Sequence, residues 1–432
     1  MENMFVINHS GTTASEIFLI LLSIPFLFLV YGLLNGPSHY WCELFVLILP
    51  LLLLQTGVFD FRVGFWVFAA ISLTLVVTIG FVMGVRIPNG LPYVIHTRDI
   101  LTMFRSNVYL MTILSILAVD FQLYPRRFCK TERYGYGLMD LGTASFVIMS
   151  GCTSAYSRTR KPPELGKTAW SAVPLVVLGF FRLVTTKKLD YQEHVSEYGV
   201  HWNFFFSLLV VTVVGDVFTW GVVRSKRSSV VLFVCGLVLA SHNFWLSRGG
   251  GKEYILDSPR DLGFASANRE GIFGCFGYLL LRIVTEETIH HAMWNGNENK
   301  TVTKRLLLVT GAGWSLFFCA SCLQTPSRRL MNGSYLVWAW SSNITIIFFY
   351  SFVFEEYMGG ILNKKVTATP LLSSINRNGL AVFVFANLLT GLVNLTLDTM
   401  AASHTTAISI LLAYLLTIFA FVKGYDRKRI IS

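Results

Sequence analysis

The chain has 432 residues, of which 53% are hydrophobic and only 14% are charged, and its mean hydropathy is +0.57. A soluble domain carries about 25% charged residues, so this composition excludes an ordinary soluble protein and indicates a polytopic membrane protein. The net charge is +11. No basic tract is interleaved with aromatic residues in a soluble context, so we expect no nucleic-acid partner. Basic loops beside an anionic lipid leaflet explain the charge better.

Long apolar runs recur along the whole chain without a long polar interval. They predict an all-α fold, a polytopic transmembrane bundle of about thirteen helices that forms one integral membrane domain over residues 1–432. The predicted spans are Glu16–Leu34, Trp41–Thr56, Val63–Val85, Leu101–Phe121, Leu138–Tyr156, Trp170–Val184, Trp202–Val223, Ser229–Leu246, Glu270–Val284, Leu306–Cys322, Ser334–Phe354, Asn378–Leu397 and Thr405–Val422.

An odd number of spans places the two termini on opposite sides of the membrane. The basic segment Lys423–Arg429 follows the last predicted span. Cytosolic loops carry an excess of Lys and Arg, so we expect a cytosolic carboxyl terminus and a lumenal amino terminus.

One polar stretch, from Ala118 to Asp140, separates two of the apolar runs. Asp120 lies at the end of the first run, and Pro125 blocks helix continuation. Asp140 opens the next run, where a carboxylate suits a helix N-terminus. The charged residues between them are Arg126, Arg127, Lys130, Glu132 and Arg133. One interpretation is an anchoring loop in which Asp120 neutralises a neighbouring arginine. The other is a site at a helix end, with a carboxylate base and cations for an anionic substrate.

Several sequence blocks favour the second interpretation. They are Leu117-Ala-Val-Asp-Phe with Tyr-Pro-Arg-Arg-Phe, Lys130-Thr-Glu and Leu138-Met-Asp-Leu-Gly142; Glu197-Tyr-Gly-Val-His-Trp-Asn-Phe-Phe-Phe206; Arg269-Glu-Gly-Ile-Phe273; and Asn378-Gly-Leu with Ala386-Asn-Leu-Leu-Thr-Gly-Leu-Val-Asn-Leu395. In this order they resemble the inositol acyltransferases of glycosylphosphatidylinositol (GPI) anchor synthesis, the PIG-W family. The resemblance runs from about residue 105 to 400; the first hundred residues and the segments 224–267 and 286–374 match poorly.

This resemblance implies an O-acyltransferase in the endoplasmic reticulum membrane. The reaction would move a fatty acyl chain, typically palmitoyl, from acyl-CoA to the inositol 2-hydroxyl of glucosaminyl-phosphatidylinositol. The expected partners are therefore acyl-CoA as co-substrate, this glycolipid and membrane lipid. We expect no metal and no further cofactor, because the sequence contains no HExxH motif, Walker loop or Cys/His ligand pattern.

The resemblance also implies that Asp120 and Lys130, ten residues apart, are catalytic. A carboxylate can accept the proton of the attacking hydroxyl, and an ammonium can stabilise negative charge on the thioester oxygen. No residue is indicated as an acyl-enzyme nucleophile, so direct transfer is expected. His201 is a competing candidate for the base, since another class of membrane acyltransferases uses a histidine in an apolar setting.

Binding roles are expected for further residues of these blocks. Arg126, Arg127 and Arg133 suit phosphate groups, which both substrates carry, because the guanidinium fork matches them; pairing with lipid headgroups is the alternative. Glu132 and Asp140 complete the expected binding residues of the same polar stretch.

A second group of expected binding residues, His201, Trp202 and Asn203, opens an aromatic helix. His201 and Asn203 could bind inositol or glucosamine hydroxyls. An interfacial aromatic belt is the alternative explanation for Trp202.

The predicted span Asn378–Leu397 carries Asn387, Thr390 and Asn394 on one helical face, which Asp398 continues just after the span. A polar face in a membrane helix is expected to line the bundle interior or a cavity. We predict that it lines a tunnel shared with Asp120; hydrogen bonding between helices is the alternative.

A secondary transporter of an anionic solute is the alternative function, since Asp216 and this polar face would suit it too. No internal repeat is evident, and the densest polar block lies at a helix end, which favours the transferase.

Overall fold

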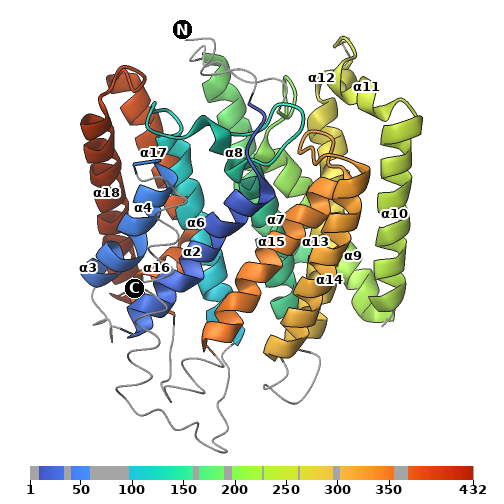
Figure 1. The fold of residues 1–432 in the computed structure, drawn as a ribbon, viewed down its shortest axis with the longest axis horizontal. Coiled ribbons are helices and arrows are strands. Elements are labelled where there is room, and N and C mark those ends of the chain that lie inside the picture. The colour runs from blue at the N-terminus through green and yellow to red at the C-terminus, as the bar shows by residue number, and fades with distance from the viewer. Residues whose placement is uncertain are drawn as a thin grey trace, which may run out of the picture.

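The computed structural model describes residues 9–33, 40–58, 97–158, 165–188, 197–225, 228–260, 263–294, 302–354 and 368–431. Within these ranges the chain folds into a bundle of helices that stand side by side (Figure 1). The long helices are α2 (Ala14–Leu33), α6 (Thr97–Ala118), α7 (Leu138–Arg158), α8 (Leu165–Lys188), α9 (Phe204–Ser225), α10 (Ser228–Arg248), α13 (Arg269–Met293), α14 (Val302–Leu323), α15 (Gly333–Phe352), α17 (Gly379–Thr396) and α18 (His404–Ile431). Shorter helices are α3 (Tyr40–Glu43), η1 (Leu44–Ile48), α4 (Leu49–Gln55), η2 (Arg126–Phe128), α11 (Gly251–Leu256), α12 (Phe264–Ala267) and α16 (Pro370–Arg377).

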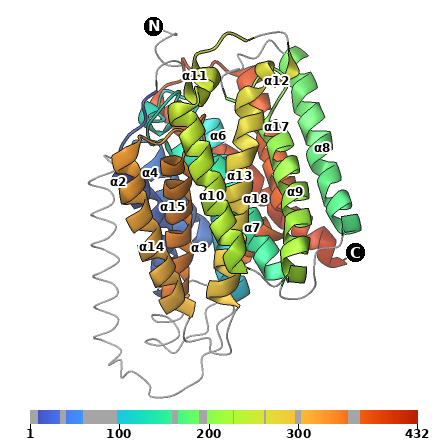
Figure 2. The same ribbon diagram turned by 90° about the vertical axis from the view of Figure 1, so that its right-hand side faces the viewer.

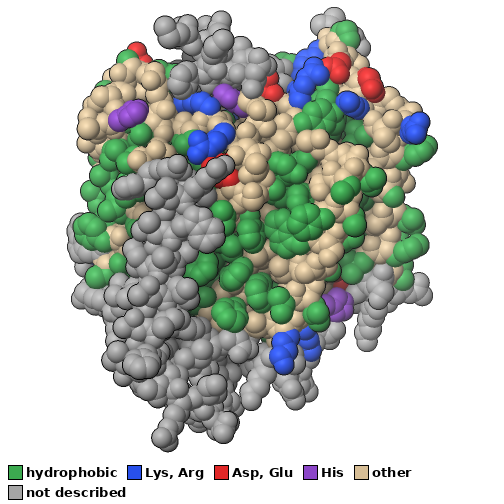
Figure 3. All heavy atoms as spheres, viewed as in Figure 1, with side chains coloured by type: hydrophobic (Ala, Val, Ile, Leu, Met, Phe, Trp, Pro, Cys, Tyr) green, Lys and Arg blue, Asp and Glu red, His purple; other side chains and the backbone are tan. Residues whose placement is uncertain are grey.

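Eight helices in the described ranges are long and apolar enough to cross a membrane: α2, α6, α8, α9, α10, α14, α17 and α18. On the face shown in Figure 3, hydrophobic side chains cover the middle of the molecule and charged side chains gather toward its upper and lower ends. The chain is therefore a polytopic helical membrane protein, as its composition predicted.

Every predicted span that falls in the described residues has a helical counterpart, whereas Val63–Val85 lies outside them. The predicted ends of two spans are wrong. We expected Thr405–Val422, but α18 continues to Ile431. We also expected Glu270–Val284, but α13 continues to Met293. The added part of the helix contains Glu286 and Glu287, which are buried. The helix can bury these two carboxylates because Arg158 of α7 forms ion pairs with both.

The predicted span Trp41–Thr56 is not one regular helix. The π-helical turn η1 separates α3 from α4. At the end of α3, the Glu43 carboxylate is fully buried and accepts the backbone N–H of Leu371 at 3.1 Å. This contact covers the start of α16, whose first N–H groups have no partner within the helix.

The helices differ in how deeply they are buried. In α6, 78% of the spanning window is buried, compared with 17% in α8 and in α10. Figure 2 shows α8 and α10 at the outside of the bundle, where large hydrophobic side chains such as Trp170 and Phe233 are exposed. The central helices α6 and α7 therefore carry the interior surfaces from which a site can be built.

The described chain begins and ends at opposite ends of the bundle. Ahead of α2, the N–H of Thr12 donates to the carbonyl of Tyr136, in the loop that follows α6, at 2.7 Å. Near the end of α18, Asp426 pairs with Arg377 of α16, and α16 packs against the first half of α6 through Ser106, which donates to Leu372 at 2.6 Å. This agrees with an odd number of crossings, while the assignment of lumen and cytosol stays a prediction.

Candidate active site

The polar loop 119–137 lies at the upper end of the bundle in Figure 1 and joins α6 to α7. We expected this span to end at Phe121, and α6 ends three residues earlier, at Ala118, just before Asp120. The guanidinium of Arg126 donates to the carbonyls of Val119 at 2.9 Å and Phe121 at 2.6 Å, which have no partner in a continuing helix. Asp120 therefore sits on a turn that Arg126 holds from both sides.

The carboxylate of Asp120 accepts a hydrogen bond from Nδ2 of Asn394, on α17, at 2.8 Å. Burial raises the pKa of Asp120, while the hydrogen bond from Asn394 and the charge of Arg126 oppose the rise. A raised pKa makes this carboxylate a stronger proton acceptor than an ordinary aspartate. Such shifts concentrate at functional sites.

Lys130 is held by a partner that the sequence analysis did not select. Its ammonium donates to Oε2 of Glu197 at 2.6 Å, and both side chains are partly buried. Burial raises the pKa of Glu197, but the charges of Lys130 and then Arg328 outweigh it and lower the pKa to about 2. Glu197 is therefore a carboxylate at neutral pH. Its place at the head of the block Glu197–Phe206 was the one signal in the sequence.

The backbone beside Lys130 is fixed by a second buried carboxylate. Asp140 is fully buried and accepts the N–H of Thr131 at 3.1 and 3.2 Å and its hydroxyl at 2.8 Å. Nε of Arg328, from the segment between α14 and α15, donates to the same carboxylate at 2.8 Å. Each of these contacts of Asp140 is made within the protein, so the geometry assigns it to shaping the loop and gives no support to the expected substrate contact.

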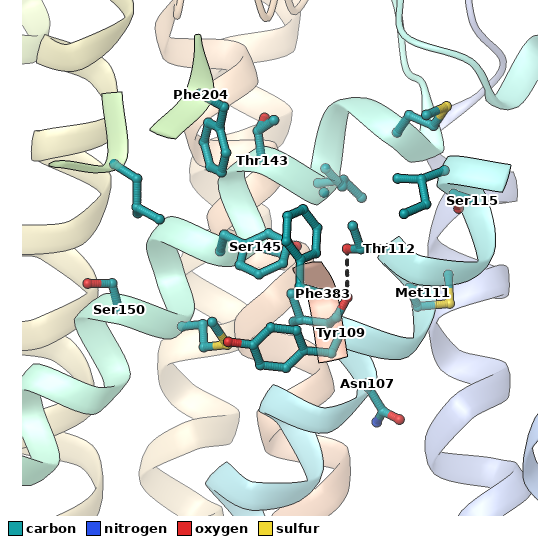
Figure 4. Close-up of a pocket in the computed structure, with 18 of the residues that line it drawn as sticks. Asn107, Tyr109, Met111, Thr112, Ser115, Thr143, Ser145, Ser150, Phe204 and Phe383 are labelled. Carbon is teal, nitrogen blue, oxygen red and sulfur yellow. Dashed lines mark hydrogen bonds between the residues drawn. The ribbon is translucent and has the colours of Figure 1, made fainter. Parts of the chain in front are cut away.

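A cavity of about 350 Å³ lies beneath the loop. It follows α7 from Leu138 to Ser150, and the twelve steps between these residues extend about 18 Å at the helical rise of 1.5 Å per residue. Figure 4 shows Tyr109, Phe204 and Phe383 around this space, together with the small polar side chains of Thr112 and Ser145. The side chains that line its loop end are more polar: Lys130, Thr143, Arg182 and Tyr198. An elongated, largely apolar cavity with a cation at one end suits an extended hydrocarbon chain that carries a polar head.

Similar sequences identify the family of this chain. The family model described as GWT1 matches residues 1–424. The chain belongs to the GWT1 family. It is 36% identical over 358 residues to the GPI-anchored wall transfer protein 1 of Emericella nidulans, covering 76% of this chain and 73% of the relative. It is 32% identical over 376 residues to the protein of the same name from Candida albicans (77% and 75%) and 31% identical over 443 residues to that of Kluyveromyces lactis (97% and 95%). The resemblance to PIG-W inositol acyltransferases is thus confirmed, and it supports a role in GPI-anchor biosynthesis.

In this GWT1 family member, the other basic residues of the loop divide into two kinds. Arg126 is committed to the backbone at the end of α6, as described above. Arg127 and Arg133 are 46% and 58% exposed and pair with Glu16 and Asp257 at the surface. These two surface guanidinium groups remain in positions where they could exchange a carboxylate for a phosphate. Glu132 is half-buried, and its carbonyl accepts from Arg329 at 3.1 Å.

The block that opens α9 has mainly structural contacts. Asn203 is buried; its side chain accepts the N–H of Phe205 at 3.0 Å and donates to the carbonyl of Gly179 at 2.9 Å. It therefore caps α9 and ties it to α8. The indole N–H of Trp202 donates to Ser207 at 2.9 Å. His201 is exposed, whereas Asp120 is partly buried and burial raises its pKa. This difference in environment favours Asp120 as the base.

The predicted polar face of α17 reaches the site at one point. Asn394 contacts Asp120, as the spacing predicted. Asn387 and Thr390 donate to carbonyls of their own helix, those of Phe383 and Ala386, and neither lines the cavity. In the described residues, the wall contributed by α17 consists instead of Leu380 and Phe383. This polar face therefore does not line the cavity that follows α7.

Proposed function

We propose that this chain is an O-acyltransferase of GPI-anchor biosynthesis in the endoplasmic reticulum membrane. It would transfer a fatty acyl chain, such as palmitoyl, from acyl-CoA to the inositol 2-hydroxyl of glucosaminyl-phosphatidylinositol. The observation that carries the proposal is the long apolar cavity that ends at Lys130, one of the two residues implied to be catalytic. Such a cavity would hold the acyl chain and leave its thioester at the polar loop.

In the proposed reaction, the oxygen of the inositol hydroxyl attacks the thioester carbon, and its proton passes to the carboxylate of Asp120. A C–O bond forms as the carbonyl electrons move onto oxygen, where the ammonium of Lys130 stabilises the negative charge. The carbonyl re-forms and the C–S bond breaks, so its electron pair leaves with CoA as a thiolate. The proton on Asp120 then returns to the thiolate or to solvent, which restores the carboxylate.

Separate partners suit these separate roles. Asp120 bonds to neutral Asn394, whereas Lys130 pairs with Glu197. Among the described residues no ion pair joins Asp120 to Lys130, and such a pair would favour the ionised forms of both and weaken the base. A carboxylate that is partly desolvated and bonded to an amide keeps its affinity for a proton.

The transporter alternative depended on Asp216 as an intramembrane acid for solute binding, and the structure gives this carboxylate a structural role. The carboxylate of Asp216 pairs with Arg282 of α13 and accepts a hydrogen bond from Thr168 of α8 at 2.7 Å. Asp216 also lies outside the set of residues that line the cavity. We therefore assign it to holding α8, α9 and α13 together.

The test uses the purified full-length protein with radiolabelled palmitoyl-CoA and glucosaminyl-phosphatidylinositol. The expected product is a less polar labelled lipid that resists phosphatidylinositol-specific phospholipase C. A glycolipid methylated at the inositol 2-oxygen serves as the control, because it has no hydroxyl to acylate. Product from the methylated lipid would assign the acyl group to another position. Solute uptake by proteoliposomes without any acylated lipid would support the transporter instead.

A further inference from the structure

Tyr198 stands out among the residues at the polar end of the cavity. It follows Glu197, the partner of Lys130, and lines the cavity together with Lys130. Its backbone is fixed, because its carbonyl accepts the N–H of Gly271 at 2.9 Å. The next residue, Gly199, has a φ of +120° and no space for a Cβ against Asn268, so only glycine fits at this turn.

The hydroxyl of Tyr198 is buried and has no hydrogen-bond partner among the described residues. Two neighbouring tyrosines differ from it: the hydroxyl of Tyr278 donates to Thr143 at 3.0 Å, and that of Tyr335 donates to the carbonyl of Asp140 at 2.7 Å. A buried polar group without a partner is costly, so native proteins rarely retain one without a reason. Burial also raises the pKa of Tyr198 well above its ordinary value, which keeps the phenol protonated as a donor.

We propose that Tyr198 is a further catalytic residue whose hydroxyl donates to the thioester carbonyl oxygen beside the ammonium of Lys130. The two donors would form one oxyanion site at the head of the cavity. This inference rests on the proposed acyl transfer. As negative charge develops on the oxygen, a positioned phenol O–H strengthens its hydrogen bond without any reorganisation, which is the property of an effective oxyanion donor. The missing partner of Tyr198 would then be the substrate.

The experiment compares the wild type with Tyr198→Phe, which removes only the hydroxyl. Two unreactive CoA derivatives are bound to the purified protein: a palmityl thioether, which has no carbonyl, and a long-chain 2-oxoalkyl thioether, which retains one. We expect Tyr198→Phe to bind the carbonyl compound with about threefold to tenfold lower affinity than the wild type, the size of one hydrogen bond. Its affinity for the thioether should be unchanged. In turnover assays kcat should fall by about 10²–10³-fold, the usual loss of one oxyanion donor. The KM for acyl-CoA, which carries a carbonyl too, should rise by no more than about threefold to tenfold.

Tyr124→Phe is the matched control. The hydroxyl of Tyr124 is also buried in this part of the protein, but Tyr124 does not line the cavity, so its removal should leave both affinities and kcat unchanged. Tyr198→Phe should unfold at the wild-type temperature or above it, because no protein hydrogen bond is lost. A clearly lower unfolding temperature would reveal a structural partner and overturn the assignment.

The outcomes separate this inference from the proposed function. Equal loss of affinity for both compounds, or unchanged binding and turnover in Tyr198→Phe, would reject Tyr198 as a donor while leaving the transferase intact. A wild type that binds neither compound and makes no acylated lipid would reject the proposed function itself.

Discussion

Replacing Asp120 by asparagine separates a catalytic carboxylate from a structural one. In the wild type, Nδ2 of Asn394 donates to the Asp120 carboxylate at 2.8 Å. Asparagine has the same shape and retains an oxygen that can accept this hydrogen bond. It lacks a carboxylate that can take a proton. General base catalysis contributes about 10²–10⁴-fold, so kcat should fall by that factor. The affinity for acyl-CoA should stay the same, because Asp120 does not line the cavity in which we propose that acyl-CoA binds.

The expected effect of Asp120→Asn on stability follows from the same contacts. A structural ion pair, when broken, would cost about 3–5 kcal/mol if it were buried. Here the pKa of Asp120 is raised by burial. When the pKa of an aspartate is higher in the folded state than in the unfolded state, folding disfavours its ionised form. Ionised Asp120 therefore does not add stability at neutral pH. In the Asp120→Asn variant, Arg126 can still donate its hydrogen bonds to the backbone carbonyls of Val119 and Phe121. The free energy of unfolding should therefore change by less than about 1 kcal/mol, the scale of one hydrogen bond.

The assay measures turnover with labelled palmitoyl-CoA and thermal unfolding in the same detergent. Asp398→Asn is the matched control, because Asp398 is exposed at the end of α17 and accepts from the backbone N–H groups of Met400 and Ala401. The wild-type pH profile should also show an acidic limb above pH 3.8, the ordinary value for aspartate, since the base must be deprotonated. A stable Asp120→Asn protein with near-normal turnover would refute the assignment of the base.

Four further predictions follow from the same structure. Asn394→Leu removes the amide that donates to Asp120 and should lower kcat by about tenfold, the effect of roughly 1.4 kcal/mol of lost orientation, with normal expression; unchanged turnover would contradict it. Because the folded pKa of Glu197 is lowered from 4.5 to about 2, its contribution to stability is present above pH 4.5 and is lost as the pH falls toward 2. The wild type should therefore lose more thermal stability over this range than Glu197→Gln, and parallel losses would argue against the pair with Lys130. A Cβ at Gly142 would meet no atom within 4 Å, and Gly142 lines the cavity. Gly142→Trp should therefore fill the cavity and lower the affinity for long-chain acyl-CoA by more than about tenfold. Gly236→Trp, which is also in open space but on exposed α10, should leave this affinity unchanged. Finally, a tag on the carboxyl terminus should be digested by protease added to sealed microsomes, and protection would reverse the predicted orientation.

The sequence predicted the helices well because the signal for a membrane span is local. A run of apolar residues of spanning length is enough to indicate a helix, and the bounds of α7 and α17 were predicted to within a few residues. The extension of α13 could not be predicted in this way. Glu286 and Glu287 mark a polar interval in any local window, and they are buried only because Arg158, more than a hundred positions earlier, neutralises them.

The site shows the same division between local and distant information. The local pattern located Asp120 at a helix end and indicated Asn394 as a residue that faces it. It could not identify Glu197 as the partner of Lys130, since nothing in a single sequence distinguishes that acid from the others near a membrane interface. It also suggested substrate contacts for Asn203, a residue type equally suited to capping a helix, and the structure uses it as a cap.

Distant contacts also decide how rigidly the loop can act. The segment around Lys130 is fixed by Glu197 from the segment before α9, by Asp140 from α7 and, through that carboxylate, by Arg328 from the segment before α15. Glu197 contacts the ammonium itself, whereas Asp140 and Arg328 hold the residue beside it, Thr131, from other parts of the chain. An oxyanion donor is effective only when it is already in place as charge develops. The loop can therefore be short and still hold its cation, because the surrounding helices supply the rigidity that its own sequence lacks.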